Sequence, residues 1–94
     1  MSRVHVEVIY EGDHCIPCVY MANVVEAATA KFDDEVRWNK VVLREKAGAK
    51  RYYELSTGLG RPAPIPSIFI NGKLCFNITP SVEELEAAIK ETND

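Results

Sequence analysis

Residues 4–18 read VHVEVIYEGDHCIPC and join two different hydrophobic patterns. From 4 to 10, side chains that favour strands alternate between two faces. A glycine and an aspartate then interrupt the pattern. Apolar side chains next recur every three or four positions over 17–32, as in an amphipathic helix. The stretch therefore predicts a strand, a short turn and a helix, with Cys15 just before the helix and Cys18 in its first turn.

The rest of the chain continues as alternating strands and helices. We expect a strand at 35–43, a helix at 44–56, a loop at 58–64, strands at 67–70 and 73–78, and a last helix opened by Ser81. Asn71 and Gly72 suit a tight hairpin, and Ser81 with Glu84 matches a capping box. The order β-α-β-α-β-β-α predicts an α/β fold. Its four-stranded mixed sheet has parallel first two strands and helices on both faces.

Length and composition limit the classes of protein that the chain can belong to. Its 94 residues are too few for two domains, so we assign residues 1–94 to one domain. The hydrophobic fraction of 47% and the net charge of −3 fit a globular protein without a nucleic-acid partner. We see no secretory signal and no apolar run of about 18 residues that could cross a membrane. We expect a soluble, cytoplasmic monomer with no membrane partner.

The cysteines point to thiol chemistry. The chain has three of them, and an odd number does not fit a purely structural disulfide framework. Cys15 and Cys18 have the C-x-x-C spacing at a strand-to-helix junction. The positive end of a helix dipole favours a thiolate, which is the nucleophilic form of cysteine. We therefore expect Cys15 to attack a disulfide and Cys18 to resolve the mixed disulfide, with this pair as the redox group and no other cofactor.

Charged neighbours of Cys15 act in opposite directions. A protonated His14 favours the Cys15 thiolate, whereas Glu11 and Asp13 oppose it. The sequence leaves open which of these effects is larger.

A second feature is the Ile65-Pro66 pair before the strand at 67–70. Proline has no amide proton for a sheet ladder, so one interpretation is that Pro66 marks the entry to a strand. The alternative interpretation is a cis-proline packed against the cysteine pair, which would point the neighbouring backbone toward an incoming peptide.

Three short stretches resemble the thioredoxin and glutaredoxin group, and most closely its compact members. They are CIPC at 15–18, IPSIFINGK at 65–73 and NITPSVEEL at 77–85. The resemblance implies that Cys15 attacks and Cys18 resolves. It also implies that Pro66 shapes a substrate groove, and we expect Ile65, His14 and Pro17 to line the same groove.

Departures from the family pattern bear on the partners. His14 stands where thioredoxin has tryptophan, and Ile9 stands near the place of its buried acid. The paired glycines and aspartate that hold glutathione in glutaredoxins are missing after Lys73, so glutathione binding is doubtful. Pro17 in third place matches thioredoxin's own motif and indicates a reducing enzyme. The implied partners are disulfide-containing proteins and a reductase that donates electrons.

Other residues and functions remain as alternatives. We expect Cys75 to be a small core residue in its strand. A basic patch on the helix at 44–56 is either a solvated face or a dock for an acidic reductase; its members are Arg44, Lys46, Lys50 and Arg51. A zinc site could use the donors of Cys15, Cys18, Cys75 and His14. The third alternative is an interaction module without catalysis.

Overall fold

The computed structural model describes residues 3–93 and has the element order β-α-β-α-β-β-α. Its strands are β1 (Val4–Tyr10), β2 (Val36–Val42), β3 (Ser67–Ile70) and β4 (Lys73–Phe76). Its helices are α1 (Ile16–Thr29), α2 (Lys46–Leu59) and α3 (Val82–Asn93). The sheet order is β2-β1-β3-β4, with β1 and β2 parallel and the other neighbouring pairs antiparallel. The predicted fold class is confirmed.

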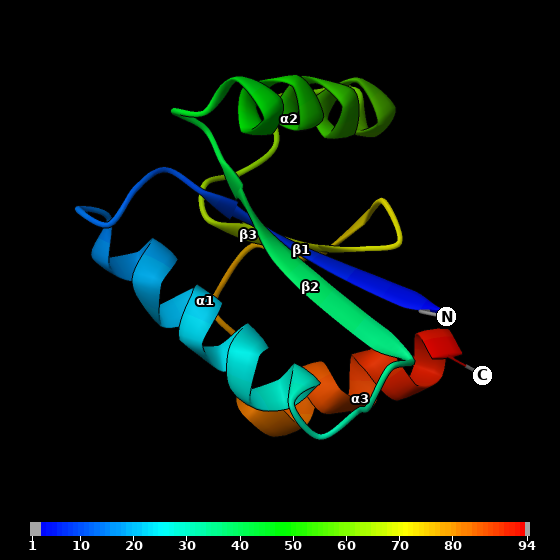
Figure 1. Ribbon diagram of the computed structural model, residues 1–94. Helices are drawn as coiled ribbons and strands as arrows, with labels where there is room; N and C mark the ends of the chain where they lie inside the picture. The colour runs from blue at the N-terminus through cyan, green and yellow to red at the C-terminus, as the bar shows by residue number, and fades with distance from the viewer. Residues whose placement is uncertain (1–2, 94) are drawn as a thin grey trace.

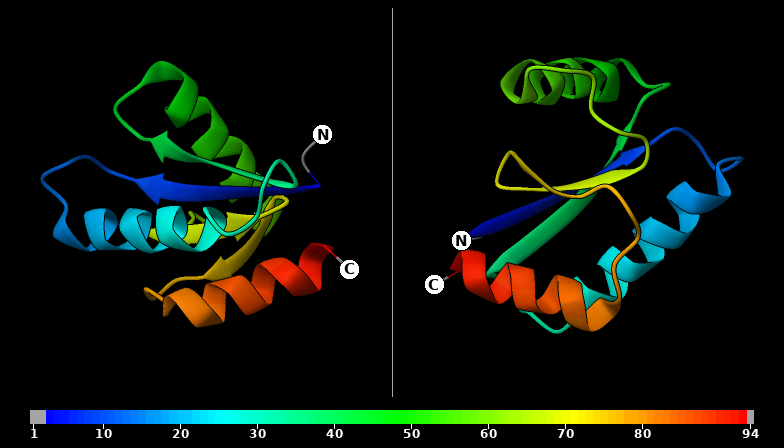
Figure 2. Two further views of the ribbon diagram at one scale, coloured as in Figure 1. Left: turned by 60° about the horizontal axis from the view of Figure 1, so that its bottom comes forward. Right: turned by 180° about the vertical axis from the view of Figure 1, so that it is seen from behind.

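Helices cover both faces of this sheet. Helices α1 and α3 pack on one face and contact each other, whereas α2 lies alone on the other face (Figure 1). The same three layers are visible from the other directions in Figure 2. Strand β1 is central and carries the chain directly into α1, so the turn between them lies at one end of the sheet.

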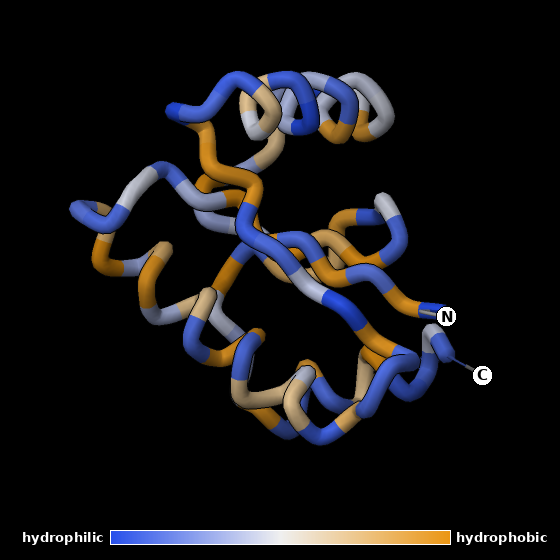
Figure 3. Tube along the Cα trace, viewed as in Figure 1, coloured by the Kyte–Doolittle hydropathy of each residue, from blue (hydrophilic) through white to orange (hydrophobic). Residues whose placement is uncertain are grey.

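The alternation in β1 divides the core between the two faces. Val4, Val6 and Val8 lie in the larger cluster with the inner sides of α1 and α3. Ile9 lies in a smaller cluster on the α2 face. That smaller cluster consists of Ile9, Val41, Leu55, Ala63 and Phe69. Figure 3 shows that much of α2 consists of hydrophilic residues.

Helix α2 lies further along the chain than its sequence predicts. It begins at Lys46 rather than residue 44 and ends at Leu59 rather than 56, so the predicted loop at 58–64 is wrong at its first two positions. Leu59 packs against the smaller core cluster, which holds the last helical turn in place. Gly60 then ends the helix with φ of 85°, a left-handed conformation that glycine adopts without strain.

Two other elements end two or three residues earlier than predicted. Helix α1 ends at Thr29 rather than 32, because the amides of Lys31 and Phe32 bond to carbonyls three residues back and tighten the chain into a turn. Strand β4 ends at Phe76 rather than 78. Phe76 pairs with Ile68, which is one residue from the start of β3. Residues after Phe76 therefore have almost no strand left to pair with.

Both predicted turn devices are confirmed. Asn71 and Gly72 have φ of 51° and 82°, as a tight hairpin of this kind requires. The Ser81 amide donates to the Glu84 carboxylate at 2.9 Å, and the Glu84 amide donates to the Ser81 hydroxyl at 3.1 Å. Hydrogen bonding of the Glu84 carboxylate to the Ser81 amide, and secondly to the Ser81 side chain, lowers the pKa of Glu84. Within residues 3–93, no helix has the length and apolarity needed to cross a bilayer.

The basic patch predicted on α2 is not uniformly solvated. Arg51 is half-buried and donates through Nε at 2.7 Å and through a terminal nitrogen at 2.9 Å to the two carboxylate oxygens of Glu7. Glu7 is only 2% exposed, so its charge needs this partner. Arg51 therefore connects α2 to the central strand, whereas Lys46 and Lys50 remain exposed.

Candidate functional site

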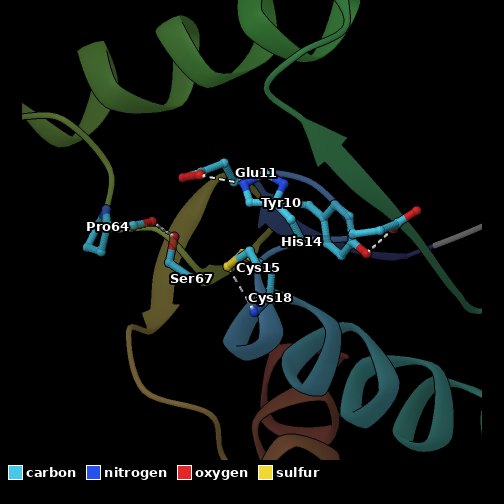
Figure 4. The surroundings of a disulfide bond; sticks show 8 residues. Tyr10, Glu11, His14, Cys15, Cys18, Pro64 and Ser67 are labelled. Carbon is cyan, nitrogen blue, oxygen red and sulfur yellow. Dashed lines mark hydrogen bonds and ion pairs between the residues drawn. A yellow bond between two sulfur atoms is a disulfide. The ribbon is translucent and has the colours of Figure 1, made fainter.

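The two cysteines of the C-x-x-C pair form a disulfide at the junction of β1 and α1. Their Cα atoms are 5.2 Å apart. Cys15 is the N-cap of α1, and its sulfur accepts a hydrogen bond from the Cys18 amide at 3.3 Å (Figure 4). Cys15 is partly exposed, whereas Cys18 is 0% exposed and packs against Tyr10 and Ala22. An external sulfur can therefore approach Cys15 but not Cys18.

The loop before Cys15 is ordered by its own hydrogen bonds. The Cys15 amide donates to the Gly12 carbonyl at 3.0 Å and closes a turn. The His14 ring lies against Gly12, where an added Cβ would come within 2.9 Å of the imidazole. His14 Nε2 lies 3.1 Å from a Glu11 carboxylate oxygen. The small residue at position 12 thus allows the histidine to fold back over the loop.

Tyr10, the last residue of β1, contacts this loop through its hydroxyl. Tyr10 is 4% exposed, and its hydroxyl donates to Asp13 at 2.5 Å. The hydrogen bond to Asp13, burial and the charge of Asp13 together raise the pKa of Tyr10. The ammonium of Lys40 on β2 lies 4.5 Å from the centre of the tyrosine ring, within the range of a cation–π interaction.

The proline segment predicted from the sequence lies at the start of β3. The Ile65–Pro66 peptide bond is cis, Ile65 is 43% exposed and Pro66 is half-buried. The Ser67 hydroxyl donates to the Pro64 carbonyl at 2.7 Å across this bend. In the view of Figure 4, Pro64 and Ser67 lie on one side of Cys15 and Tyr10 lies on the other.

The remaining predicted groove residues lie beside the disulfide along the chain. His14 precedes Cys15 and is exposed, and Pro17 is exposed in the first turn of α1. Pro17 suits this position, since the first helical turn has no use for its missing amide proton. Ile16, between the two, is 61% exposed, which is unusual for isoleucine and adds apolar surface next to the disulfide.

A pocket of about 550 Å³ beside the disulfide was not predicted from the sequence. It lies between the β1–α1 loop and the end of β2, and is lined by Tyr10, Gly12, Asp13, His14, Lys40, Val42, Arg44 and Glu45. The parallel pairing of Tyr10 with Val42 brings the ends of β1 and β2 together. The predicted parallel pairing of β1 and β2 aligns the ends of these strands, which is the signal that Lys40 and Arg44 lie near the β1–α1 loop.

The prediction that Cys75 belongs to the core is wrong. Cys75 is a free, exposed thiol on β4, because this edge strand turns its odd-numbered positions outward. No group of three or more histidine, cysteine or acidic side chains within residues 3–93 is arranged to hold a metal ion. The four donors of the zinc alternative are therefore not assembled by this fold.

Comparisons with known proteins support the fold. No protein-family model matches the chain, and no curated protein is significantly similar to it. Among solved structures, thioredoxin-2, described as a component of malaria parasite protein secretion machinery, is similar with a TM-score of 0.68 and 17% identity. That alignment covers 94% of this chain and 82% of the other. A structure described only as a malarial protein has a TM-score of 0.66 and 17% identity, covering 95% and 96%. The chain thus has a thioredoxin-like fold.

Proposed function

We propose that this protein is a thiol–disulfide oxidoreductase that uses Cys15 and Cys18 to reduce disulfides of protein or small-molecule substrates. The observation that carries the proposal is the asymmetry of the pair. Cys15 is accessible and caps the N-terminus of α1, whereas Cys18 is fully buried behind it. The thioredoxin-like fold is consistent with this role, and the site itself supplies the chemistry.

The proposed reaction moves two electrons in two exchange steps. The thiolate of reduced Cys15 attacks one sulfur of the substrate disulfide, forms a mixed disulfide and releases the first substrate sulfur as a thiolate. Cys18 then loses its proton and attacks the sulfur of Cys15. The Cys15–Cys18 disulfide forms, and the second substrate thiolate leaves and takes up a proton. A reductase or an external dithiol returns the two electrons.

Local structure favours Cys15 as the attacking residue. The N-terminus of α1 carries partial positive charge and free amide protons. The Cys18 amide already points at the Cys15 sulfur at 3.3 Å, and a donor to the charged form lowers a thiol pKa. The short distance between the cysteines in the chain lets Cys18 reach the mixed disulfide without a large movement.

Exposed apolar side chains suit an extended substrate segment. Ile16 and Ile65 are 61% and 43% exposed. We propose that Ile65 and Pro66 line one side of the substrate groove and that His14 and Pro17 line its other side. An apolar groove of this kind would accept a protein segment around a disulfide more readily than a charged small molecule.

Reduction of insulin disulfides by dithiothreitol, with catalytic amounts of the protein, tests the function. We expect Cys15→Ser to abolish catalysis and Cys75→Ser, the matched control, to retain it. The Cys18→Ser variant should accumulate mixed disulfides at Cys15 because the resolving thiol is missing. Catalysis by Cys15→Ser at the wild-type rate, or trapping at Cys75, would refute the assignment.

The reduction potential of the pair tests the direction of the reaction. Equilibration in dithiothreitol or glutathione buffers, read by mass spectrometry, should give a value near that of thioredoxin, about −270 mV. A value of about −120 mV would instead indicate an oxidant.

A further inference from the structure

Two carboxylates precede the nucleophile, and both are engaged by neighbouring side chains. Glu11 lies 3.1 Å from His14 Nε2, and Asp13 accepts the Tyr10 hydroxyl at 2.5 Å. A negative charge two residues from Cys15 would ordinarily oppose its thiolate. The position of the Asp13 carboxylate therefore bears directly on the reactivity of Cys15.

Tyr10 offers a fixed donor to this carboxylate. Tyr10 is 4% exposed and packs with Cys18 and Ala22, so its hydroxyl is held by the core rather than by the loop. Tyr10, Asp13 and Lys40 line the same pocket, and the ammonium of Lys40 lies 4.5 Å from the tyrosine ring. The Asp13 carboxylate therefore accepts the Tyr10 hydroxyl proton in a pocket that Lys40 of β2 also lines.

The charged and titratable groups around this loop are few enough to consider together. Glu11, Asp13 and His14 belong to the loop itself, Lys40 comes from β2, and Arg44 and Glu45 come from the segment that leads into α2. Glu11 and His14 bond to each other. Asp13 is therefore the loop acid whose charge depends on Tyr10 for its placement.

We propose that Tyr10 is a positioning residue for the redox pair, whose hydroxyl holds the Asp13 carboxylate toward β2 so that this charge does not oppose the Cys15 thiolate. The inference rests on the proposed function in that Cys15 is taken as the nucleophile. It adds a residue outside the C-x-x-C motif that acts through Asp13. The hydroxyl is the atom that matters, because phenylalanine would retain the ring packing against Cys18.

The test is a double-mutant cycle on the reduced protein. Tyr10→Phe, Asp13→Asn and the double variant are alkylated with iodoacetamide from pH 4 to 9, and the labelling rate of each cysteine is read by mass spectrometry. At pH values below the midpoint of the Cys15 pH profile, Tyr10→Phe should lower the labelling rate of Cys15 about threefold. This change corresponds to a Cys15 thiol pKa raised by about half a unit. The same change in the Asp13→Asn background should have no effect.

The Asp13→Asn variant gives an independent reading, since Asp13 is exposed and its replacement does not disturb the core. Its Cys15 rate should stay within about twofold of wild type if the charge is already held away. A rate several-fold above wild type would overturn the inference. So would an unchanged Tyr10→Phe profile, or an equal loss from Tyr10→Phe in both backgrounds, which would indicate ring packing instead of charge.

The wild-type protein separates this inference from the proposed function. If Cys15 does not react faster than Cys18 and Cys75 at mildly acidic pH, the assignment of the nucleophile fails whatever the variants do. If Cys15 reacts first and the cycle shows no coupling between Tyr10 and Asp13, only the role of Tyr10 fails.

Discussion

At the scale of single residues, burial determines which side chains depend on a specific partner. Glu7 is 2% exposed in the central strand and bonds through both oxygens to Arg51, 44 positions further along the chain. Burying a carboxylate is costly unless its partner stays in place. A substitution at Arg51 removes the partner on α2 and leaves the residues of β1 unchanged.

Replacing Arg51 with methionine should destabilise the protein by about 1–3 kcal/mol, since it leaves the Glu7 charge buried and unpaired. This cost is set below the about 3–5 kcal/mol typical of fully buried pairs, because the Arg51 side chain is 39% exposed. Urea denaturation measures the change. Lys50→Met is the matched control on the same helix, and it should cost less than about 0.5 kcal/mol because Lys50 is exposed. Equal effects of the two variants would show that the Glu7 pair does not stabilise the fold.

Cys75 shows that exposure alone does not make a thiol reactive. Partial burial of its sulfur and then the negative charge of Glu91 on α3 raise its pKa above the ordinary value of 9.0. A raised pKa leaves less thiolate at neutral pH. Cys75 should therefore be alkylated slowly at pH 7 and reach its half-maximal rate only above pH 9.0.

The oxidised protein isolates this measurement, because Cys15 and Cys18 are then joined and Cys75 is the free thiol. Glu91→Gln should move the half-maximal pH of alkylation downward by removing one of the two causes. Rapid labelling of Cys75 at pH 7 would contradict the expectation.

At the scale of elements, the close approach of α2 to the end of β2 depends on one glycine. A Cβ built at Gly48 would lie 1.9 Å from the carbonyl oxygen of Val42, which is backbone and cannot rotate away. The sequence pattern shows this glycine only as a weak point in a helix. The structure shows that it is the contact that lets α2 begin so soon after β2.

Gly48→Ala should destabilise the protein by about 3 kcal/mol or more, since the helix must move away from the strand. Gly58 provides the control within the same helix, because an added Cβ there meets nothing within 4 Å. Gly58→Ala should stabilise by about 0.5–1 kcal/mol through the lower entropy of the unfolded chain. Thermal or urea unfolding of both variants gives the comparison. A small effect at Gly48 would mean that α2 can be displaced at little cost.

At the scale of the whole molecule, the sequence predicts the local patterns well and the distant contacts poorly. Strand alternation, the turn at Asn71 and the capping box at Ser81 are properties of short stretches, and all three are present. The ion pair between Glu7 and Arg51 joins segments whose register depends on the folded layers. No local pattern specifies it.

In the candidate site, too, some features follow from local sequence patterns and others do not. The positions of Cys15 before α1 and Cys18 in its first turn follow from the strand-to-helix pattern. The pairing of Tyr10 with Asp13 does not, because it depends on the direction of a turn through Gly12. The error at Cys75 has a related cause: one face of the edge strand β4 is left exposed, and alternation alone does not say which residues lie on that face.

The unequal layers of the molecule predict unequal stability. Helix α1 buries six residues, namely Cys18, Met21, Ala22, Val25, Ala28 and Thr29, and packs against α3 as well as the sheet. Helix α2 buries only Gly48 and Leu55 and has its face of the sheet to itself. Regions with few buried apolar contacts open locally before the whole protein unfolds. We therefore expect α2 to separate from the sheet at a lower free energy than α1.

Native-state hydrogen exchange should show this difference directly. The protection factors of the central amides of α2 should be lower by about tenfold or more than those of β1 and α1. Arg51→Met should weaken the protection of α2 further, because it removes the side chain that ties this helix to β1, whereas Lys50→Met should leave it unchanged. Equal protection in α1 and α2 would contradict the expectation, since both layers would then open only in the global unfolding of the chain.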